Sequence, residues 1–345
     1  MFQVFAATPE DMGPGQIGAH AARAEAMGFD GLQVPDAIHD GLLLAALALN
    51  ATRSLIVGTA VLVAFPRSPM ITAIAAWDLQ AMSGGRFEVG LGTQIKPNIE
   101  QRYSARWDSP MPQLREYVQA MKAIFHSFQT GERLQFVGEH YTFTKLQPFF
   151  NPGPIAHPDI PILCGAVGPA MTKMVGAVAD GMITHPTNTP PRYIREVCLP
   201  RLQQGFERGQ RDPDSFKLVL GPLTATGRDE GEVAAAWEKQ RNMLGFLYST
   251  PAYWPSLELF GWQDKGQQLL DMTRAGEWAA MPGIVTDDML AEFVPRGTYA
   301  DIAQVMRQRY AGLSRRITFP MPVNPQDDVL VAEVVRQLQA PCEAH

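Results

Sequence analysis

Short, continuously apolar runs alternate along this chain with longer segments whose apolar residues recur at helical spacing. The clearest case opens with Leu55–Val63, which is too apolar for a strand with one face in water and suits a strand covered on both sides. A helical pattern follows, and its apolar face is formed by Ile71, Ile74, Ala75, Leu79 and Met82. Two glycines in Ser83–Arg86 end that helix, and the apolar run Phe87–Leu91 leads into Gly92-Thr93-Gln94. The segment predicts a complete βαβ unit, and ligands of parallel α/β folds bind where such strands end.

The same alternation extends over the whole chain. It predicts eight strands, at Phe2–Ala7, Gly31–Pro35, Ile56–Val63, Phe87–Leu91, Ile160–Cys164, Gly181–Thr184, Lys217–Thr226 and Arg316–Pro320. Helical patterns fall between most of them, among them Arg115–Phe128, a segment after Pro169, and segments starting near Tyr299 and Val329. Eight alternations predict a (β/α)₈ TIM barrel. An open doubly wound sheet is the alternative, but no GxGxxG follows any predicted strand.

Two insertions interrupt the plain repeat. Leu134–Pro154, before the fifth strand, carries strand-like and turn residues and predicts a hairpin or an ordered loop. Asp229–Arg315 is too long for one connection between the seventh and eighth strands, and we expect it to form extra helices near the barrel mouth. This insertion would serve as a lid or substrate wall, or equally as a subunit interface. We predict a single domain over residues 1–345.

Composition narrows the class of protein. The chain has 345 residues, of which 46% are hydrophobic and 19% charged, as expected for a large buried core. Its net charge is -6 and its lysines and arginines are scattered, so a nucleic-acid partner is not expected. Three widely spaced cysteines fit a reducing compartment, and no apolar run approaches about 18 residues. The N-terminus has no signal-peptide pattern, and we therefore expect a soluble cytoplasmic protein.

Common metal and nucleophile signatures are missing from the sequence. The seven histidines form neither HxH nor HExxH, and GxSxG does not occur. Cys164 ends the fifth predicted strand and fits a small buried apolar residue better than a nucleophile. The sequence therefore predicts no metal site.

Polar residues at the strand ends are the stronger candidates. The second strand runs into Asp36 and His39, and this imidazole can donate a hydrogen bond or act as an acid near neutral pH. The sixth strand leads to His185, and the fifth to Gly165–Gly168, where backbone amides at a helix start suit a phosphate. Lys96, after the fourth strand, adds a cation. A phosphorylated cofactor lying across several strand ends would use all of these groups.

These residues together resemble the bacterial luciferase-like family of flavin and deazaflavin oxidoreductases over nearly the whole chain. The resemblance is carried by GTAVLVAFPRSPMITAIAAWDLQAMSGGRFEVGLGTQ, GPAMTKMVGAVADG, FLYSTPAYWPSLELFGW and FVPRGTYADI. The segments PRSP, WDLQ, HPTNTP and YSTPAY are similar to an actinobacterial branch that depends on coenzyme F420, a deazaflavin.

The resemblance implies a cofactor ring at the barrel mouth, supported by a bulge in the third strand with a non-prolyl cis peptide at Ala60-Val61. Catalytic roles would fall to Asp36 and His39, although many relatives place a histidine directly after the acidic residue and this chain has Ala37 there. The implied cofactor-binding residues are Thr59, Ala60, Val61, Gly92, Thr93, Gln94, Lys96, Gly165, Ala166, Val167, Gly168 and His185.

Three functions follow as expectations from the resemblance. The first is a coenzyme F420-dependent oxidoreductase that moves a hydride between the deazaflavin and a small organic substrate. The second is an FMN-dependent monooxygenase that uses O₂ and a separate flavin reductase, and the third is a non-catalytic flavin-binding protein. The family also implies a homodimer.

Overall fold

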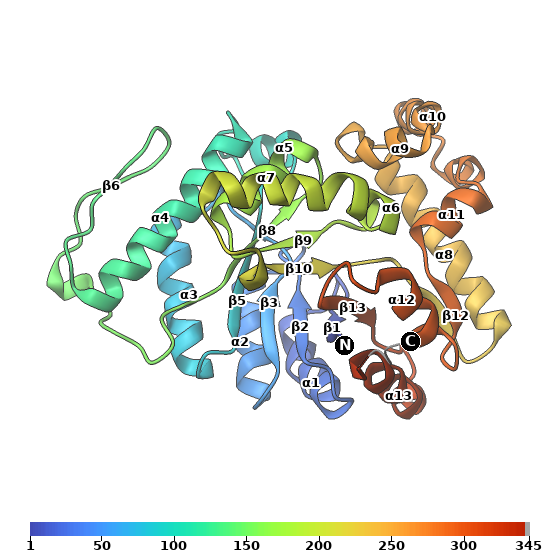
Figure 1. Cartoon of the computed structure of the whole chain (residues 1–345), viewed down its shortest axis with the longest axis horizontal. Helices are drawn as coiled ribbons and strands as arrows, with labels where there is room; N and C mark the ends of the chain where they lie inside the picture. The colour runs from blue at the N-terminus through green and yellow to red at the C-terminus, as the bar shows by residue number, and fades with distance from the viewer. Residues whose placement is uncertain (342–345) are drawn as a thin grey trace.

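The computed structural model, which describes residues 1–341, is a closed parallel barrel surrounded by helices (Figure 1). Around the barrel the strands pair in the order β1, β2, β3, β5, β8, β9, β10, β13, and β13 returns to β1. Their bounds are β1 Gln3–Ala7, β2 Gly31–Val34, β3 Ile56–Thr59, β5 Phe87–Gly92, β8 Ile162–Ala166, β9 Gly181–Thr184, β10 Lys217–Leu220 and β13 Arg316–Pro320. The predicted (β/α)₈ barrel is confirmed.

A bulge interrupts the third barrel strand, as expected. Gly58 pairs with Glu88 in β3, and Leu62 pairs with Leu91 in β4 (Leu62–Val63), which continues the same strand. Three residues, 59–61, therefore lie opposite only two of β5, which is the arrangement of a β-bulge. The peptide bond Ala60-Val61 is cis, as the resemblance predicted.

Helices cover the outside of the barrel and enclose its main apolar core. They are α1 Pro14–Ala26, α2 Gly41–Ala51, α3 Pro69–Ser83, α4 Pro110–Thr130, α5 Pro169–Val178, α6 Pro191–Tyr193, α7 Leu199–Gly209, α12 Ile302–Tyr310 and α13 Asp328–Gln339. The start of α4 lies five residues before the predicted one, because Pro110 is well suited to the first position of a helix.

The predicted packing face of α3 is wrong for three of its five residues. Ile71, Ile74 and Met82 are exposed, whereas Leu79 is buried as predicted. The side packed inward is formed by Thr72, Ala73, Ala76, Trp77, Leu79, Gln80 and Ser83. The Gln80 side chain on this side accepts a hydrogen bond from the Phe87 amide and so joins the helix to β5. The outer side of α3 is consequently apolar and faces solvent.

Two predictions about the irregular segments have different outcomes. The segment before the fifth strand does form a hairpin, with β6 Phe136–Val137 antiparallel to β7 Thr142–Phe143, and it projects from the barrel (Figure 1). The seventh strand, however, ends at Leu220, so its predicted extension to Thr226 is wrong. Gly221-Pro222 interrupts it, and β11 (Ala225–Gly227) leaves the barrel to pair with β12 (Arg296–Thr298).

The long insertion is helical, as expected. It contains α8 Glu230–Tyr248, α9 Pro255–Phe260, α10 Gln263–Ala275 and α11 Asp287–Phe293, grouped at one side of the barrel in Figure 1. These elements enclose a separate apolar cluster that includes Trp237, Tyr248 and Phe293. The insertion thus has a core of its own.

A buried ionic group ties three strands together inside the barrel. The Glu88 carboxylate lies 2.7 Å from both the Lys217 Nζ and an Arg316 Nη. Burial favours the protonated acid, but the two cations outweigh it and the pKa of Glu88 is lowered. Glu88 is therefore a structural carboxylate that is held ionised.

Candidate active site

The bulge lies on an apolar layer inside the barrel. Leu163, Ile183 and Val219, from β8, β9 and β10, form a buried cluster against which the partly buried Ala60 and Val61 pack. These five residues, which we call the floor, come from four strands of the barrel: the bulged third strand and the three consecutive strands β8, β9 and β10. An apolar floor of this kind suits the face of a planar ring.

Gly92 makes room for the bulge. A Cβ atom at Gly92 would lie 2.3 Å from a Val61 methyl group, so a larger residue there would displace the bulge. Gly165 is also close, since its Cβ would lie 3.4 Å from Val61. The two predicted glycines therefore have a steric role beside Val61.

Thr59 is part of the barrel wall. Its hydroxyl donates to the Gly90 carbonyl at 2.8 Å and accepts from the Gly90 amide at 2.9 Å. The side chain is 1% exposed. Thr59 thus holds the bulge in place from the side of β5, and its hydroxyl proton is already used within the wall.

Asp36 is surrounded by donors. One carboxylate oxygen accepts from the Gly41 amide at 2.9 Å, and the other accepts from the Val63 amide at 2.9 Å. The Arg67 guanidinium donates to both oxygens, at 2.8 and 3.2 Å. The side chain of Asp36 is 5% exposed. This carboxylate joins the end of β2 to the residues that follow the bulge.

Arg67 also connects Asp36 to a second carboxylate, that of Asp40. Its second Nη lies 2.8 Å from Asp40, whose other oxygen caps α2 by accepting from the Leu42 and Leu43 amides. Burial would lower the pKa of Arg67, but the charges of Asp36 and Asp40 outweigh it and raise that pKa. Both acids thus face a permanent cation, and their carboxylates position the loop.

His39 lies on the same loop, against the start of α1. A Cβ atom at Gly13 would lie 3.4 Å from the His39 Nε2, and the imidazole is half-buried. Among the described residues, none forms a hydrogen bond with it. His39 is therefore free to interact with a ligand, whereas Asp36 is fully engaged.

His185 follows β9 and stacks on the insertion. Its ring lies 4.2 Å from that of Tyr253, with an interplanar angle of 11°. The Thr187 amide donates to Nδ1, and the Thr187 hydroxyl lies 2.8 Å from the same nitrogen. Burial lowers the pKa of His185 to about 4, so the ring is neutral near pH 7. Since Nδ1 accepts, Nε2 carries the hydrogen and can donate to a ligand.

The loop after β8 combines exposed amides with a fixed backbone. Gly168 is the N-cap of α5 and has no side chain to cap it, and Pro169 follows. Within residues 1–341, no acceptor faces the amides of Ala170 and Met171. Uncapped amides at a helix start attract anions. Gly165–Gly168 thus leads into a stretch with the chemistry of a phosphate site.

Neighbouring side chains hold that loop in shape. Asn188 donates to the Ala166 carbonyl at 2.8 Å, and the Tyr193 hydroxyl donates to the Val167 carbonyl at 3.1 Å. Asn188 is 1% exposed, yet its side-chain oxygen has no partner within the described part of the chain. Both loop carbonyls therefore have hydrogen-bond donors within the protein.

The loop after β5 is more exposed. Gln94 has a φ of 61°, and its side-chain oxygen accepts from the Ile95 amide and the Asn98 side chain. The Thr93 hydroxyl donates to the Gln94 carbonyl. Lys96 is largely exposed, and its Nζ lies 3.8 Å from Glu100. Lys96 therefore already has a carboxylate partner.

Sequence reasoning missed the roles of Arg67 and Tyr253. The segment PRSP that contains Arg67 was noticed, but its contact with Asp36 spans 31 residues and follows no periodicity. The stack of Tyr253 on His185 spans an insertion whose fold the sequence did not reveal. The run HPTNTP, in contrast, already pointed to a polar strand end that includes Asn188.

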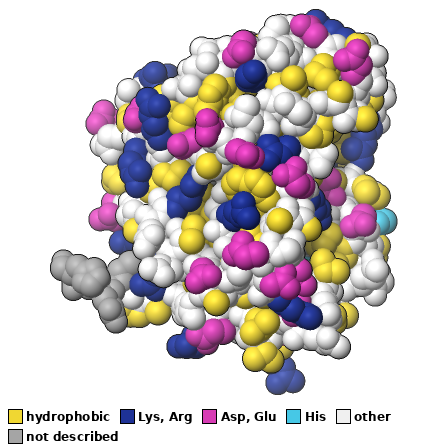
Figure 2. Space-filling view, turned by 90° about the vertical axis from the view of Figure 1, so that its right-hand side faces the viewer, with side chains coloured by type: hydrophobic (Ala, Val, Ile, Leu, Met, Phe, Trp, Pro, Cys, Tyr) yellow, Lys and Arg dark blue, Asp and Glu magenta, His cyan; other side chains and the backbone are white. Residues whose placement is uncertain are grey.

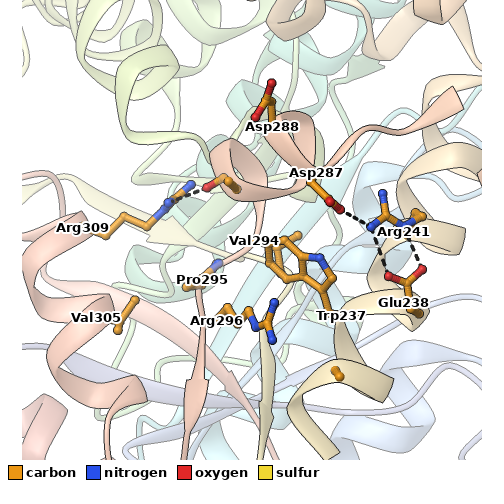
Figure 3. A pocket seen from close by; sticks show the side chains of 12 residues that line it. Trp237, Glu238, Arg241, Asp287, Asp288, Val294, Pro295, Arg296, Val305 and Arg309 are labelled. Carbon is orange, nitrogen blue, oxygen red and sulfur yellow. Dashed lines mark hydrogen bonds and ion pairs between the residues drawn. The ribbon is translucent and has the colours of Figure 1, made fainter. Parts of the chain in front are cut away.

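A cavity of about 740 Å³ lies outside the barrel strands, between α8, α11, β12 and α12 (Figure 3). Arg241 pairs there with Glu238 and Asp287, and the Arg296 guanidinium lies 5.3 Å from the Trp237 ring. None of the predicted site residues lines it. On the face that Figure 2 shows, acidic and basic side chains lie intermixed with hydrophobic ones. The acidic and basic residues that line this cavity are equal in number, which favours a structural role over the binding of a charged ligand.

Other reactive groups within residues 1–341 have structural surroundings. Cys164 is fully buried, and burial raises the pKa of its thiol to about 12; Cys342 lies outside the described residues. Potential metal ligands gather at Glu116, Glu139 and His140, but the Glu116 carboxylate accepts from both neighbours' amides and thereby caps the hairpin. In this part of the chain, none of the helices has the length and apolar character needed to cross a membrane.

Comparison with known proteins agrees with this geometry. The chain is 42% identical over 307 residues to an uncharacterized protein of Mycobacterium tuberculosis strain H37Rv, with 88% of this chain and 90% of that protein covered. It is 30% identical to an F420-dependent glucose-6-phosphate dehydrogenase of Nakamurella multipartita, covering 86% and 87%. The structure of coenzyme F420-dependent tetrahydromethanopterin reductase from Methanopyrus kandleri superposes with a TM-score of 0.80 at 19% identity, covering 98% of each chain. A family profile described as luciferase-like monooxygenase matches residues 1–316, and the chain belongs to that family.

Proposed function

We propose that this protein is a coenzyme F420-dependent oxidoreductase that transfers a hydride between the deazaflavin and a small organic substrate. The relative from Nakamurella multipartita, an F420-dependent dehydrogenase, supports this choice within the family. The observation that carries the proposal is the apolar floor around Ala60 and Val61, on the strands whose ends also carry His185 and Gly165–Gly168.

The residues present fit a planar ring with a phosphate attached. Ala60 and Val61 are partly buried and apolar, as a ring face requires, and the uncapped amides of Ala170 and Met171 are anion donors. Gly165–Gly168 would approach the phosphate, with Thr93 and Gln94 beside the ring. Asn188 and Tyr193 would hold the loop. When bound, coenzyme F420 supplies the carbon that accepts or donates the hydride.

We assign two histidines to the substrate. The neutral His185 would donate a hydrogen bond from Nε2 to a substrate oxygen, and Tyr253 would fix the plane of its ring. His39, which has no partner among the described residues, would take up or release the proton that accompanies hydride transfer. Asp36 would act as a positioning residue, since its oxygens already accept from Gly41, Val63 and Arg67.

In the first test, the purified protein is titrated in parallel with oxidised coenzyme F420 and with FMN. Binding is measured by fluorescence and by calorimetry. We expect tight binding of F420 and weak binding of FMN. Turnover is then screened with reduced F420 and carbonyl substrates, and with oxidised F420 and alcohol substrates. His39→Ala is expected to retain F420 affinity and lose turnover, whereas full turnover in this variant would exclude the assigned role. His185→Phe keeps the stacked ring, and is expected to raise KM without changing F420 affinity.

A second function is an FMN-dependent monooxygenase that receives reduced flavin from a separate reductase. It is favoured by the description of the family whose profile the chain matches. Preferential FMN binding, together with O₂ consumption coupled to an oxygenated product, would support this function and refute the F420-dependent one.

A further inference from the structure

A second cavity, of about 670 Å³, lies on the outside of the barrel between α4, α5 and α7. These helices lie side by side in Figure 1, and α5 packs on both of the others. Its lining, which we call the α5 groove, comprises Met111, Pro112, Arg115, Gln119, Ala170, Lys173, Met174, Ala177, Val178, Arg208 and Gly209. The groove is separate from the cavity beside the insertion.

The α5 groove is positively charged in a chain whose net charge is -6. Arg115, Lys173 and Arg208 line it, and no carboxylate does. Within residues 1–341, none of these three cations forms an ion pair or a side-chain hydrogen bond. The acids next to them in sequence are engaged elsewhere, since Glu116 caps the hairpin and Glu207 accepts from the Gln203 side chain. Three unpaired cations around one groove favour a ligand with several negative charges.

The groove also begins where the predicted phosphate site ends. Ala170 lines the groove, and its amide is one of the two uncapped amides at the start of α5. From Ala170 to Val178 the helix runs about 12 Å along the groove, at roughly 1.5 Å per residue. Lys173 lies near the start of this helix, whereas Gly209, the neighbour of Arg208, packs on Ala177 near its end. An extended chain of anions suits cations at both ends of the groove better than one phosphate does.

We propose that the α5 groove binds an extended polyanionic chain, with carboxylates or phosphates spaced along it and short methylene segments between them. Arg115, Lys173 and Arg208 would bind successive anionic groups, and the side chains of Met111 and Met174 would pack against the methylenes between them. Such a chain has two sources. It is either the glutamate tail of coenzyme F420, which continues from the phosphate, or a free polyanion. Only the first source rests on the proposed function.

The experiment uses the full-length protein with Lys173→Gln and Arg208→Gln combined, and Lys239→Gln as the control. Lys239 lies on the exposed side of α8 and lines neither cavity. The probes are linear γ-linked tetraglutamate, and coenzyme F420 preparations with short and long glutamate tails, each titrated at low and high salt. The deazaflavin chromophore without phosphate or tail reports separately on ring binding.

We expect tetraglutamate to bind the wild type and the control in a salt-dependent manner, and the double variant to bind about tenfold more weakly. If the variant also abolishes the preference for long-tailed F420 while chromophore binding is unchanged, the cofactor tail occupies the groove. If tetraglutamate binding falls but tail length has no effect, the groove binds a free polyanion. Equal tetraglutamate affinities in variant and control overturn the proposal. If the wild type, the double variant and the control all fail to bind the chromophore, the proposed function is refuted, but the proposal that the groove binds a polyanion is not.

Discussion

Replacing Asp36 by asparagine tests whether this carboxylate is structural. Asparagine has the same shape but offers one acceptor oxygen and an NH₂ group, so it places a donor against the Val63 or Gly41 amide and removes the charge opposite Arg67. Breaking a buried ion pair costs about 3–5 kcal/mol. Arg67 keeps its contact with Asp40, so we expect the lower end, about 3 kcal/mol.

For a chain of 345 residues, the entropy of unfolding near the midpoint is about 0.7 kcal/mol per kelvin, and this loss lowers Tm by about 4 °C. The assay is thermal unfolding monitored by circular dichroism. Asp108→Asn is the matched control, because its ion pair with Arg106 is exposed and contributes at most about 1 kcal/mol. An Asp36→Asn protein that melts with the wild type but has no turnover would refute the structural assignment and make Asp36 a catalytic residue.

Three further predictions concern the bulge, the buried imidazole and the outer helices. Gly92→Ala drives a methyl group against Val61, and we expect a loss of about 1–3 kcal/mol in urea unfolding; unchanged stability would contradict the steric role. Because the folded-state pKa of His185 is about 4 and the unfolded value is 6.5, its contribution is full above pH 6.5 and is lost as the pH falls towards 4. Compared with His185→Phe, the wild type should lose up to about 3 kcal/mol of unfolding free energy over that window, and parallel profiles would exclude a buried neutral ring. Leu43 and Ile71, 51% and 62% exposed on α2 and α3, are expected to lie in a homodimer interface. Leu43→Asp with Ile71→Asp should then sediment as a monomer, unlike the wild type; identical sedimentation would place the interface elsewhere.

The barrel could be predicted because its strands are buried on both faces. A run such as Leu55–Val63 has no polar face, and that pattern is difficult to satisfy outside a covered parallel sheet. The face of α3 could not be predicted in the same way. That helix is apolar on two sides, and periodicity alone does not tell whether isoleucines or short side chains pack on the strands.

The residues of the candidate site likewise differ in whether local sequence could predict them. The positions of Gly165–Gly168 and His185 at the ends of β8 and β9 could be predicted, because strand ends are marked by local sequence. The roles of Arg67 and Tyr253 could not, because their contacts with Asp36 and His185 join segments far apart in the chain and depend on tertiary packing. The ending of β10 at Leu220 was a local signal that was overlooked, since Gly221-Pro222 follows directly.

The insertion's separate core has a consequence for how this enzyme class diversifies. Tyr253 belongs to elements held by the cluster around Tyr248 and Phe293, whereas Val61 is held by the strands of the barrel. Side chains of the insertion, Tyr253 among them, can therefore be exchanged with little effect on the register of the strands beneath. Under the proposed function, a duplicated gene would acquire a new substrate by altering one apolar cluster while inheriting the cofactor-binding surface intact.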